Sequence, residues 1–374
     1  MSTSSAKIPR IPKYISLADH LRIQVQTGKL KPGEQLPTVS ELRSEHQVSC
    51  STIEKVYAIL EKEGLIIREQ GRGVFVSRIS GTKRPTTGII GFIGYGFLEE
   101  VNNSQFWTSL LRGIQDAASR HKIQLMLLND GMDSNVWNKI DGLLLSEAEE
   151  EIELHLALIP LGMPCISLIT PSTKTTSIIF DDFQGARDAT NNLIALGHKN
   201  IAYLIDLDNN NETLKRRVAG YKAALREAGI EADETAIKPL RKAYWYDGSK
   251  IDYRGGARRC VQDWLADNGK VLKYTAVLAQ NDQAALGIVE ELTVSGIRVP
   301  EDVSVVGFDG IEIPENGLPR LSTVEIPLEK IGASAVRLLS KQVKAREGGT
   351  PPWIETIVLT SHYRQGATTA PIKK

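Results

Sequence analysis

Apolar residues recur with a helical period near the start of the chain. Three stretches, 15–28, 39–47 and 51–65, place apolar residues three or four positions apart, as helices do when they bury one face. Two short apolar runs follow within 65–76 and are separated by a glycine-rich turn. This arrangement is typical of a small hairpin. We therefore expect three helices and a hairpin in this part of the chain.

From residue 88 onward, short aliphatic runs alternate with helical stretches of twelve to eighteen residues. Strands that are apolar on both sides are covered by helices on both faces, and such alternation builds parallel sheets. Eight runs over about 290 residues are more than one open sheet usually holds. The predicted fold class is therefore α/β, with two doubly wound parallel-sheet lobes behind a smaller α+β domain. The eight runs are 88–96, 124–130, 141–146, 164–170, 177–182, 200–208, 275–282 and 303–310.

A polar segment separates these two parts. Residues 77–88 contain Gly, Pro and Thr and follow neither apolar period, which is typical of a linker. The predicted domains are a head at 1–78, a linker at 79–87 and a body at 88–374.

The net charge of zero is unevenly distributed along the chain. Residues 1–84 carry 14 Lys or Arg and 8 Asp or Glu, whereas residues 85–374 carry 31 and 37. A basic head on an acidic body favours a polyanion as the partner of the head alone.

Composition excludes several classes of protein. A hydrophobic fraction of 41% and a charged fraction of 24% are those of a soluble globular protein. No apolar run approaches the ~18 to 20 residues of a membrane-spanning helix, and the start lacks the apolar core of a secretory signal. We therefore expect a cytoplasmic protein. Cys50, Cys165 and Cys260 lie more than ninety residues apart, which fits neither a disulfide framework nor a zinc site.

The head has the helix, turn and helix arrangement that places one helix in the major groove of DNA. The recognition helix is expected to begin near Ser49, where hydroxyls and helix-terminal amides suit phosphates. Tyr57 either reaches a phosphate or packs. Arg72, between two glycines, either enters a minor groove or belongs to an ordinary β-turn. The predicted DNA-binding residues are Thr38, Ser40, Ser49, Ser51, Thr52, Lys55, Tyr57, Gln70 and Arg72.

Three motifs in this order resemble the DNA-binding domain of the GntR family of bacterial repressors. They are the sequence from Gly33 to Pro37, the helix end at 63–65, and the wing at 70–76. The resemblance implies a winged helix-turn-helix fold and a known docking mode. Many members have Arg or Lys where this chain has Ser40, Cys50 and Glu54, at positions from which the family contacts operator DNA. The resemblance therefore implies the docking mode of the family but not its operator sequence.

The body resembles the effector domain of the LacI/GalR repressors, which is related to periplasmic sugar-binding proteins. The resemblance spans residues 87–362 and is clearest at 276–310. It implies a periplasmic-binding-protein-like body in which Arg217, Asn281 and Asp309 contact an effector between the lobes. Asn281 and Asp309 directly follow strands, where open α/β sheets bind ligands. Alternatively, Asn281 caps the next helix and Asp309 closes a turn.

Aromatic residues could complete this site. Phe106 and Trp107 either stack on the apolar face of a sugar ring or pack as core residues of their helix. Residues 244–246 form an aromatic cluster in an irregular stretch where the family often supplies a stacking residue. Thr170 stands where relatives usually have Asp.

These observations predict a sugar-responsive bacterial transcription regulator. The head would bind double-stranded operator DNA. The body would bind a small sugar-like effector and form a homodimer, and binding of the effector would release the repressor from DNA. Two alternatives remain: an activator, or a sugar-binding protein whose head contacts proteins. The sequence lacks the motifs of acyl transfer, nucleotide hydrolysis and dinucleotide chemistry, and of metal sites, so no enzyme activity, cofactor, metal or membrane partner is expected.

Overall fold

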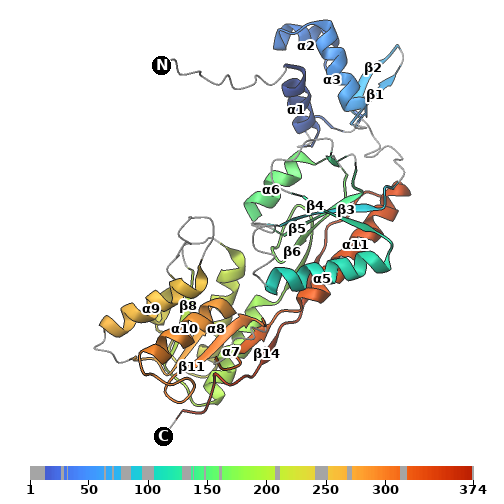
Figure 1. The fold of residues 1–374 in the computed structure, drawn as a ribbon. Coiled ribbons are helices and arrows are strands. Elements are labelled where there is room, and N and C mark those ends of the chain that lie inside the picture. Colours follow the sequence, from blue (N-terminus) through green and yellow to red (C-terminus); the bar gives the residue numbers. More distant parts are fainter. Residues whose placement is uncertain are drawn as a thin grey trace, which may run out of the picture.

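A computed structural model gives the architecture of the chain (Figure 1). The residues that it describes are 13–26, 29–31, 33–62, 65–69, 71–76, 86–94, 105–128, 136–137, 139–146, 149–159, 162–206, 211–240, 252–267, 272–311 and 318–372. Most of the predicted linker, Gln70 and the aromatic residues 244–246 lie outside the described residues.

The head consists of three helices and a two-stranded antiparallel hairpin, which confirms the prediction from its apolar period. Its core is a cluster of its own, which includes Leu21, Ile53 and Leu60. Thr38 and Glu41 form the capping box of the second helix, because each side chain accepts a hydrogen bond from the other's backbone N–H. The elements are α1 (Lys13–Gln26), α2 (Val39–His46), α3 (Cys50–Lys62), β1 (Ile66–Glu69) and β2 (Gly73–Val76).

The first lobe is a six-stranded parallel sheet in the order β13-β7-β6-β5-β3-β4. Helices α5 and α11 pack against each other beside this sheet (Figure 1). The strands are β3 (Ile89–Gly94), β4 (Gln124–Leu127), β5 (Gly142–Ser146), β6 (Cys165–Leu168), β7 (Thr176–Phe180) and β13 (Thr356–Leu359); the helices are α5 (Gln105–Arg120), α6 (Glu149–Leu158) and α11 (Leu328–Glu347).

The second lobe has the strand order β14-β12-β11-β10-β8-β9, in which β14 alone runs antiparallel to its neighbour. Its strands are β8 (Ile201–Ile205), β9 (Ile237–Pro239), β10 (Ala276–Ala279), β11 (Ser304–Asp309), β12 (Ser322–Glu325) and β14 (His362–Arg364). Its helices are α7 (Asp182–Ala195), α8 (Glu212–Glu227), the short η2 (Glu234–Ala236), α9 (Tyr253–Asp267) and α10 (Asp282–Val294).

The chain passes between the two lobes three times. The crossings follow β7, β12 and β13. The main hydrophobic cluster contains residues of both lobes, such as Phe180 and Phe308. The predicted pair of doubly wound lobes is therefore confirmed. No helix among the described residues is long and apolar enough to cross a membrane.

Candidate functional site

Arg217 on α8 is the centre of a buried polar cluster in the second lobe. Its side chain is 7% exposed. Its Nε donates to Oδ1 of Asp182 at 2.8 Å, and its Nη1 donates to the carbonyl oxygen of Gln280 at 2.7 Å. The guanidinium carbon lies 3.7 Å from the centroid of the Phe308 ring. These contacts fix the guanidinium plane, because a fork of donors and a ring face both constrain its orientation.

This cluster lies where the first crossing enters the second lobe. Asp182 begins α7, immediately after β7 of the first lobe, whereas Gln280 and Asp309 stand at the carboxyl ends of β10 and β11. The side chain of Gln280 also accepts from the backbone N–H of Asp206, which follows β8, at 2.6 Å. The carboxyl ends of neighbouring parallel strands are the usual ligand site in such sheets.

Two carboxyl groups interact with the guanidinium, and a third lies next to them. Asp182 and Asp309 interact with Arg217, whereas Asp282 interacts with Asp309 and Arg364. Asp182 and Asp282 are buried and Asp309 is partly exposed. Burial raises the pKa of Asp182 to about 6, although Arg217 opposes this shift. Burial, and then the charge of Asp282, raise the pKa of Asp309 well above its usual range. Burial therefore favours the neutral form of these carboxyl groups.

The backbone of Asp309 has a φ of 120°, which non-glycine residues rarely adopt. Strained residues of this kind concentrate at functional sites. The last residue of β11 is therefore held in an unfavourable conformation next to Arg217, and it keeps a partly exposed carboxyl group there.

Asn281 has the capping role that was one of its two alternatives. Its Oδ1 accepts from the backbone N–H of Ala284 at 2.9 Å, at the start of α10. The Nδ2 group is still able to donate to a ligand, since the cap uses only the oxygen. Effector contact by Asn281 stays a prediction.

The structure does not bring the two aromatic candidates of the first lobe into the Arg217 cluster. Phe106 and Trp107 lie in the first turn of α5, half-buried, with ring centroids 5.4 Å apart in an edge-to-face arrangement. Both pack against the main hydrophobic cluster. This geometry favours the core alternative, and stacking on a sugar stays a prediction. Thr170 lies two residues beyond β6, where its carbonyl accepts from the Ser167 hydroxyl at 2.5 Å.

Sequence reasoning missed Asp182 and Gln280, and it did not predict that the side chain of Asp282 is buried and hydrogen-bonded. Asp282 is fully buried and accepts from the Thr323 hydroxyl and the Ile311 N–H, each at 2.6 Å. Asp182 is the last residue of the predicted run 177–182, so the rule that selected the strand-end residues Asn281 and Asp309 would also have selected it. The partners of Asp282 are 29 and 41 residues distant, and no local pattern reveals them.

Asp282 predicts a pH dependence of stability. Burial raises its pKa to about 7, whereas an unfolded chain has a pKa of about 3.9. Between these values the folded protein binds a proton that the unfolded chain does not. The resulting stabilisation is therefore complete below about pH 4 and is lost as the pH rises through about 7.

We expect the free energy of unfolding to fall between about pH 6 and pH 8 more in the wild type than in Asp282→Asn, which cannot titrate. The substitution also removes the charge of Asp282 that raises the pKa of Asp309, so the difference between the two proteins reports on this pair of carboxyl groups. Urea denaturation at both pH values measures the difference. Equal pH dependence in the two proteins would contradict the assignment.

The predicted DNA-binding residues of α3 gather at its first turn. Ser49 precedes the helix, and its Oγ lies 2.9 Å from Oγ of Ser51 and 2.8 Å from Oγ1 of Thr52. The Ser49 hydroxyl also accepts from the backbone N–H of Thr52 at 3.2 Å. Lys55 is exposed, with its Nζ 5.7 Å from the centroid of the Tyr14 ring. Hydroxyls, helix-terminal amides and a cation therefore share one end of the helix, as phosphate contact requires.

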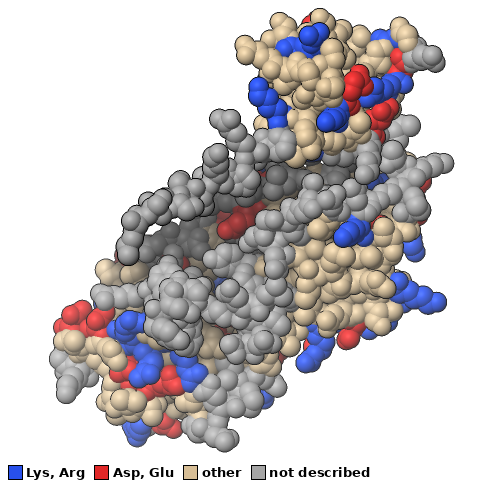
Figure 2. Space-filling view, turned by 45° about the horizontal axis from the view of Figure 1, so that its top comes forward, with Lys and Arg blue, Asp and Glu red and all other residues tan. Residues whose placement is uncertain are grey.

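The other predicted head residues have mixed surroundings. Ser40 and Arg72 are exposed, and Arg72 pairs with Glu69 in the hairpin. Tyr57 is buried and donates its hydroxyl to the Pro37 carbonyl at 2.6 Å, which favours the packing alternative. Both basic and acidic side chains reach the surface of the head in Figure 2.

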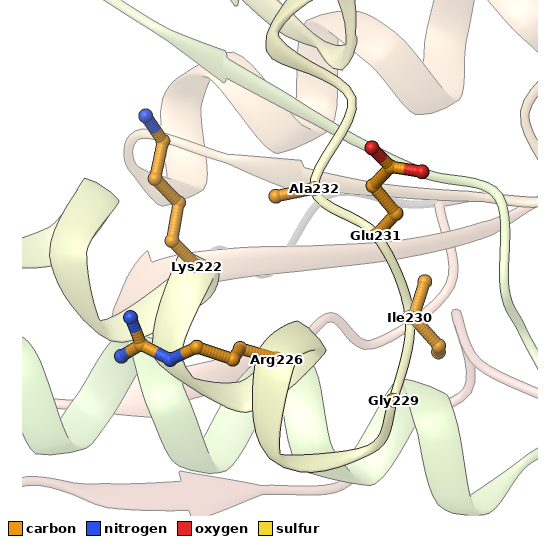
Figure 3. A pocket seen from close by; sticks show the side chains of 6 residues that line it. All are labelled: Lys222, Arg226, Gly229, Ile230, Glu231 and Ala232. Atoms are coloured by element: carbon orange, nitrogen blue, oxygen red, sulfur yellow. The ribbon is translucent and has the colours of Figure 1, made fainter.

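A separate pocket of about 420 Å³ lies at the far end of α8 (Figure 3). Its lining residues are Lys222, Arg226, Gly229, Ile230, Glu231 and Ala232. Lys222 is already paired with Glu234 at 2.6 Å. The pocket shares no residue with the Arg217 cluster. The Arg217 cluster therefore remains the candidate effector site.

Two family models match the chain. The model described as "Bacterial regulatory proteins, gntR family" matches residues 13–76, and the one described as "Periplasmic binding protein-like domain" matches residues 190–368.

Two regulatory proteins are similar to this chain in sequence. Catabolite control protein A of Priestia megaterium is 29% identical over 79% of this chain and 84% of its own length. The arabinose metabolism transcriptional repressor of Geobacillus stearothermophilus is 24% identical over 90% of this chain and 92% of its own length.

The fold is also similar to a solved LacI family transcriptional regulator from Enterococcus faecium with bound ribose. The TM-score is 0.61, at 25% identity over 76% of this chain and all of that structure. The chain therefore joins a gntR-family helix-turn-helix domain to a periplasmic binding protein-like domain, and its relatives are LacI/GalR-type regulators.

Proposed function

We propose that this protein is a cytoplasmic transcriptional repressor that binds operator DNA as a homodimer and is released by a sugar. The observation that carries this proposal is the joining, in one chain, of a winged helix-turn-helix head to a lobe with Arg217, Asp182 and Asp309 beside a crossing between lobes. The domains proposed are DNA binding at 1–78, a linker at 79–87, and effector binding and dimerisation at 88–374.

Effector control requires the ligand to bind the DNA-competent and incompetent dimers with different affinities. A ligand that bridges the lobes changes their relative position and thereby the separation of two attached heads. Coupling free energies of ~1 to 3 kcal/mol are typical of such linkage.

The chemistry of the cluster favours an uncharged sugar. Asp182 and Gln280 already occupy Nε and Nη1 of Arg217, while Asp309 offers an acceptor nearby. A hydroxyl group accepts from the remaining guanidinium nitrogen and donates to an oxygen of the Asp309 carboxyl. A phosphate or carboxylate would instead find the guanidinium already paired with Asp182.

A thermal-shift screen against monosaccharides, sugar phosphates and nucleosides tests effector binding, because a ligand of the folded state raises Tm by mass action. We expect stabilisation by a neutral pentose or hexose and little or none by its phosphate ester. Stabilisation by phosphate esters alone would contradict the proposed effector, and silence across the panel would count against a sugar-binding body.

Removing a cation from the head tests DNA binding. Lys55→Ala or Arg72→Ala is expected to weaken binding at every sequence and to reduce the salt slope of log K by about one, since each removes a charge near phosphate. Fluorescence anisotropy over a range of salt concentrations measures this slope. An unaltered slope would contradict the docking mode. A wild-type head without salt-dependent DNA affinity would favour the alternative in which the head contacts proteins.

A further inference from the structure

Arg68 in the hairpin joins two carboxylates of the recognition helix. Its Nη1 lies 2.7 Å from Oε2 of Glu54, and its Nε lies 3.0 Å from Oε2 of Glu61. Glu54 and Glu61 are seven residues apart on α3, so they lie on one face of the helix, two turns apart. A single guanidinium therefore spans the acidic edge of α3.

These carboxylates lie on the element that would enter the DNA groove. Glu54 is 52% exposed and Glu61 is 44% exposed. Among the α3 residues whose side chains the structure describes, the only cation is Lys55. Without Arg68 the recognition helix would bring an excess of negative charge toward phosphates, which weakens association with DNA.

The guanidinium is well placed to offset one of these two negative charges. Arg68 also lies over the ring of Tyr57, at 5.7 Å from its centroid, and Tyr57 is anchored in the core by its bond to Pro37. The two acidic partners raise the pKa of Arg68 above its usual value. The planar fork of Arg suits such two-sided pairing with carboxylates better than a Lys ammonium does.

We propose that Arg68 is a positioning residue for DNA binding, which offsets part of the negative charge of Glu54 and Glu61 and holds the hairpin against the recognition helix. This inference rests on the proposed function of the head. It assigns the effect of Arg68 on DNA affinity to the two carboxylates and not to a phosphate contact.

Arg68→Ala in the full-length protein is expected to weaken DNA binding about tenfold, because the recognition helix then carries two uncompensated carboxylates. Adding Glu54→Gln and Glu61→Gln to the same chain should restore most of the affinity, with the wild-type salt slope. A phosphate contact by Arg68 predicts the opposite: no restoration, and a slope lowered by about one.

The probe is a duplex that the wild-type protein enriches from a randomised pool, and the readout is fluorescence anisotropy at several salt concentrations. Arg112→Ala is the matched control, since it removes an equally charged, exposed side chain that pairs with Glu329 at 3.5 Å in the body. We expect it to bind DNA like the wild type.

A further variant covers the case in which Arg68→Ala fails to fold. Glu54→Gln with Glu61→Gln keeps Arg68 and changes only exposed side chains, and it should bind the duplex more tightly than the wild type. Unchanged or weaker binding by this variant would overturn the proposal, as would wild-type affinity in Arg68→Ala or a failure of the amides to rescue it. A wild-type protein that shows no salt-dependent binding would instead overturn the proposed function.

Discussion

Replacing Arg217 with Ala is expected to lower the free energy of unfolding by about 3 to 5 kcal/mol, because it leaves the buried carboxyl of Asp182 without its partner. The guanidinium is held by Asp182, Gln280 and the Phe308 ring, so all three contacts are lost at once. The same substitution should abolish the response to effector. Urea denaturation and effector titration measure the two effects.

A double variant separates stability from effector binding. Arg217→Met with Asp182→Asn removes both charges, and replacement of a buried ion pair by groups of similar volume is often close to neutral. We expect this variant to recover most of the lost stability and to remain unable to bind effector. The head has its own core, so operator binding should persist. Normal effector affinity in the double variant would exclude Arg217 from the site.

Replacing Asp309 with Ala is expected to reduce effector affinity about ten- to hundredfold, the cost of leaving an effector hydroxyl without its hydrogen-bond partner. Operator affinity without effector should be unchanged. Asp309→Asn retains the shape of the side chain and cannot titrate, so it shows whether the carboxyl group itself is needed.

Asp302→Ala is the matched control for Asp309, because it removes an exposed carboxylate that pairs with Arg298 at 2.8 Å, away from the Arg217 cluster. It should bind effector like the wild type. Isothermal titration with a sugar from the thermal-shift screen gives the affinities. An Asp309→Ala protein with unchanged affinity would show that the end of β11 does not contact the effector.

Strands with a strong apolar pattern could be predicted from the sequence, and weakly patterned ones could not. All eight aliphatic runs form strands. Most of these strands are buried on both faces, which requires continuous apolar residues, whereas β4 is a partly exposed edge strand. By contrast, β13 and β14 are edge strands in which exposed and half-buried residues mix. Their sequences lack the apolar run. The antiparallel direction of β14 follows from its position just after β13 of the other lobe.

The candidate site was only partly predictable, for a related reason. Strand ends indicated Asn281 and Asp309, and Arg217 was found through resemblance to a family. The pairing of Arg217 with Asp182 joins residues 35 positions apart, and only the packing of α7 against α8 brings them together.

The head shows a similar division. The capping box joins Thr38 and Glu41, which are three residues apart, whereas the bond from the Tyr57 hydroxyl to Pro37 depends on tertiary packing. The same holds for Arg68, which contacts residues 7 and 14 positions earlier in the chain. Local sequence cannot reveal that the hairpin folds back onto α3.

The most direct test of the whole account is the affinity of the full-length protein for its selected operator duplex, measured with and without a saturating sugar from the thermal-shift screen. We predict that the sugar weakens DNA binding by about five- to 150-fold, the range of typical allosteric coupling, and that Asp309→Ala removes this effect. Identical DNA affinity with and without a sugar that demonstrably binds the body would contradict the account.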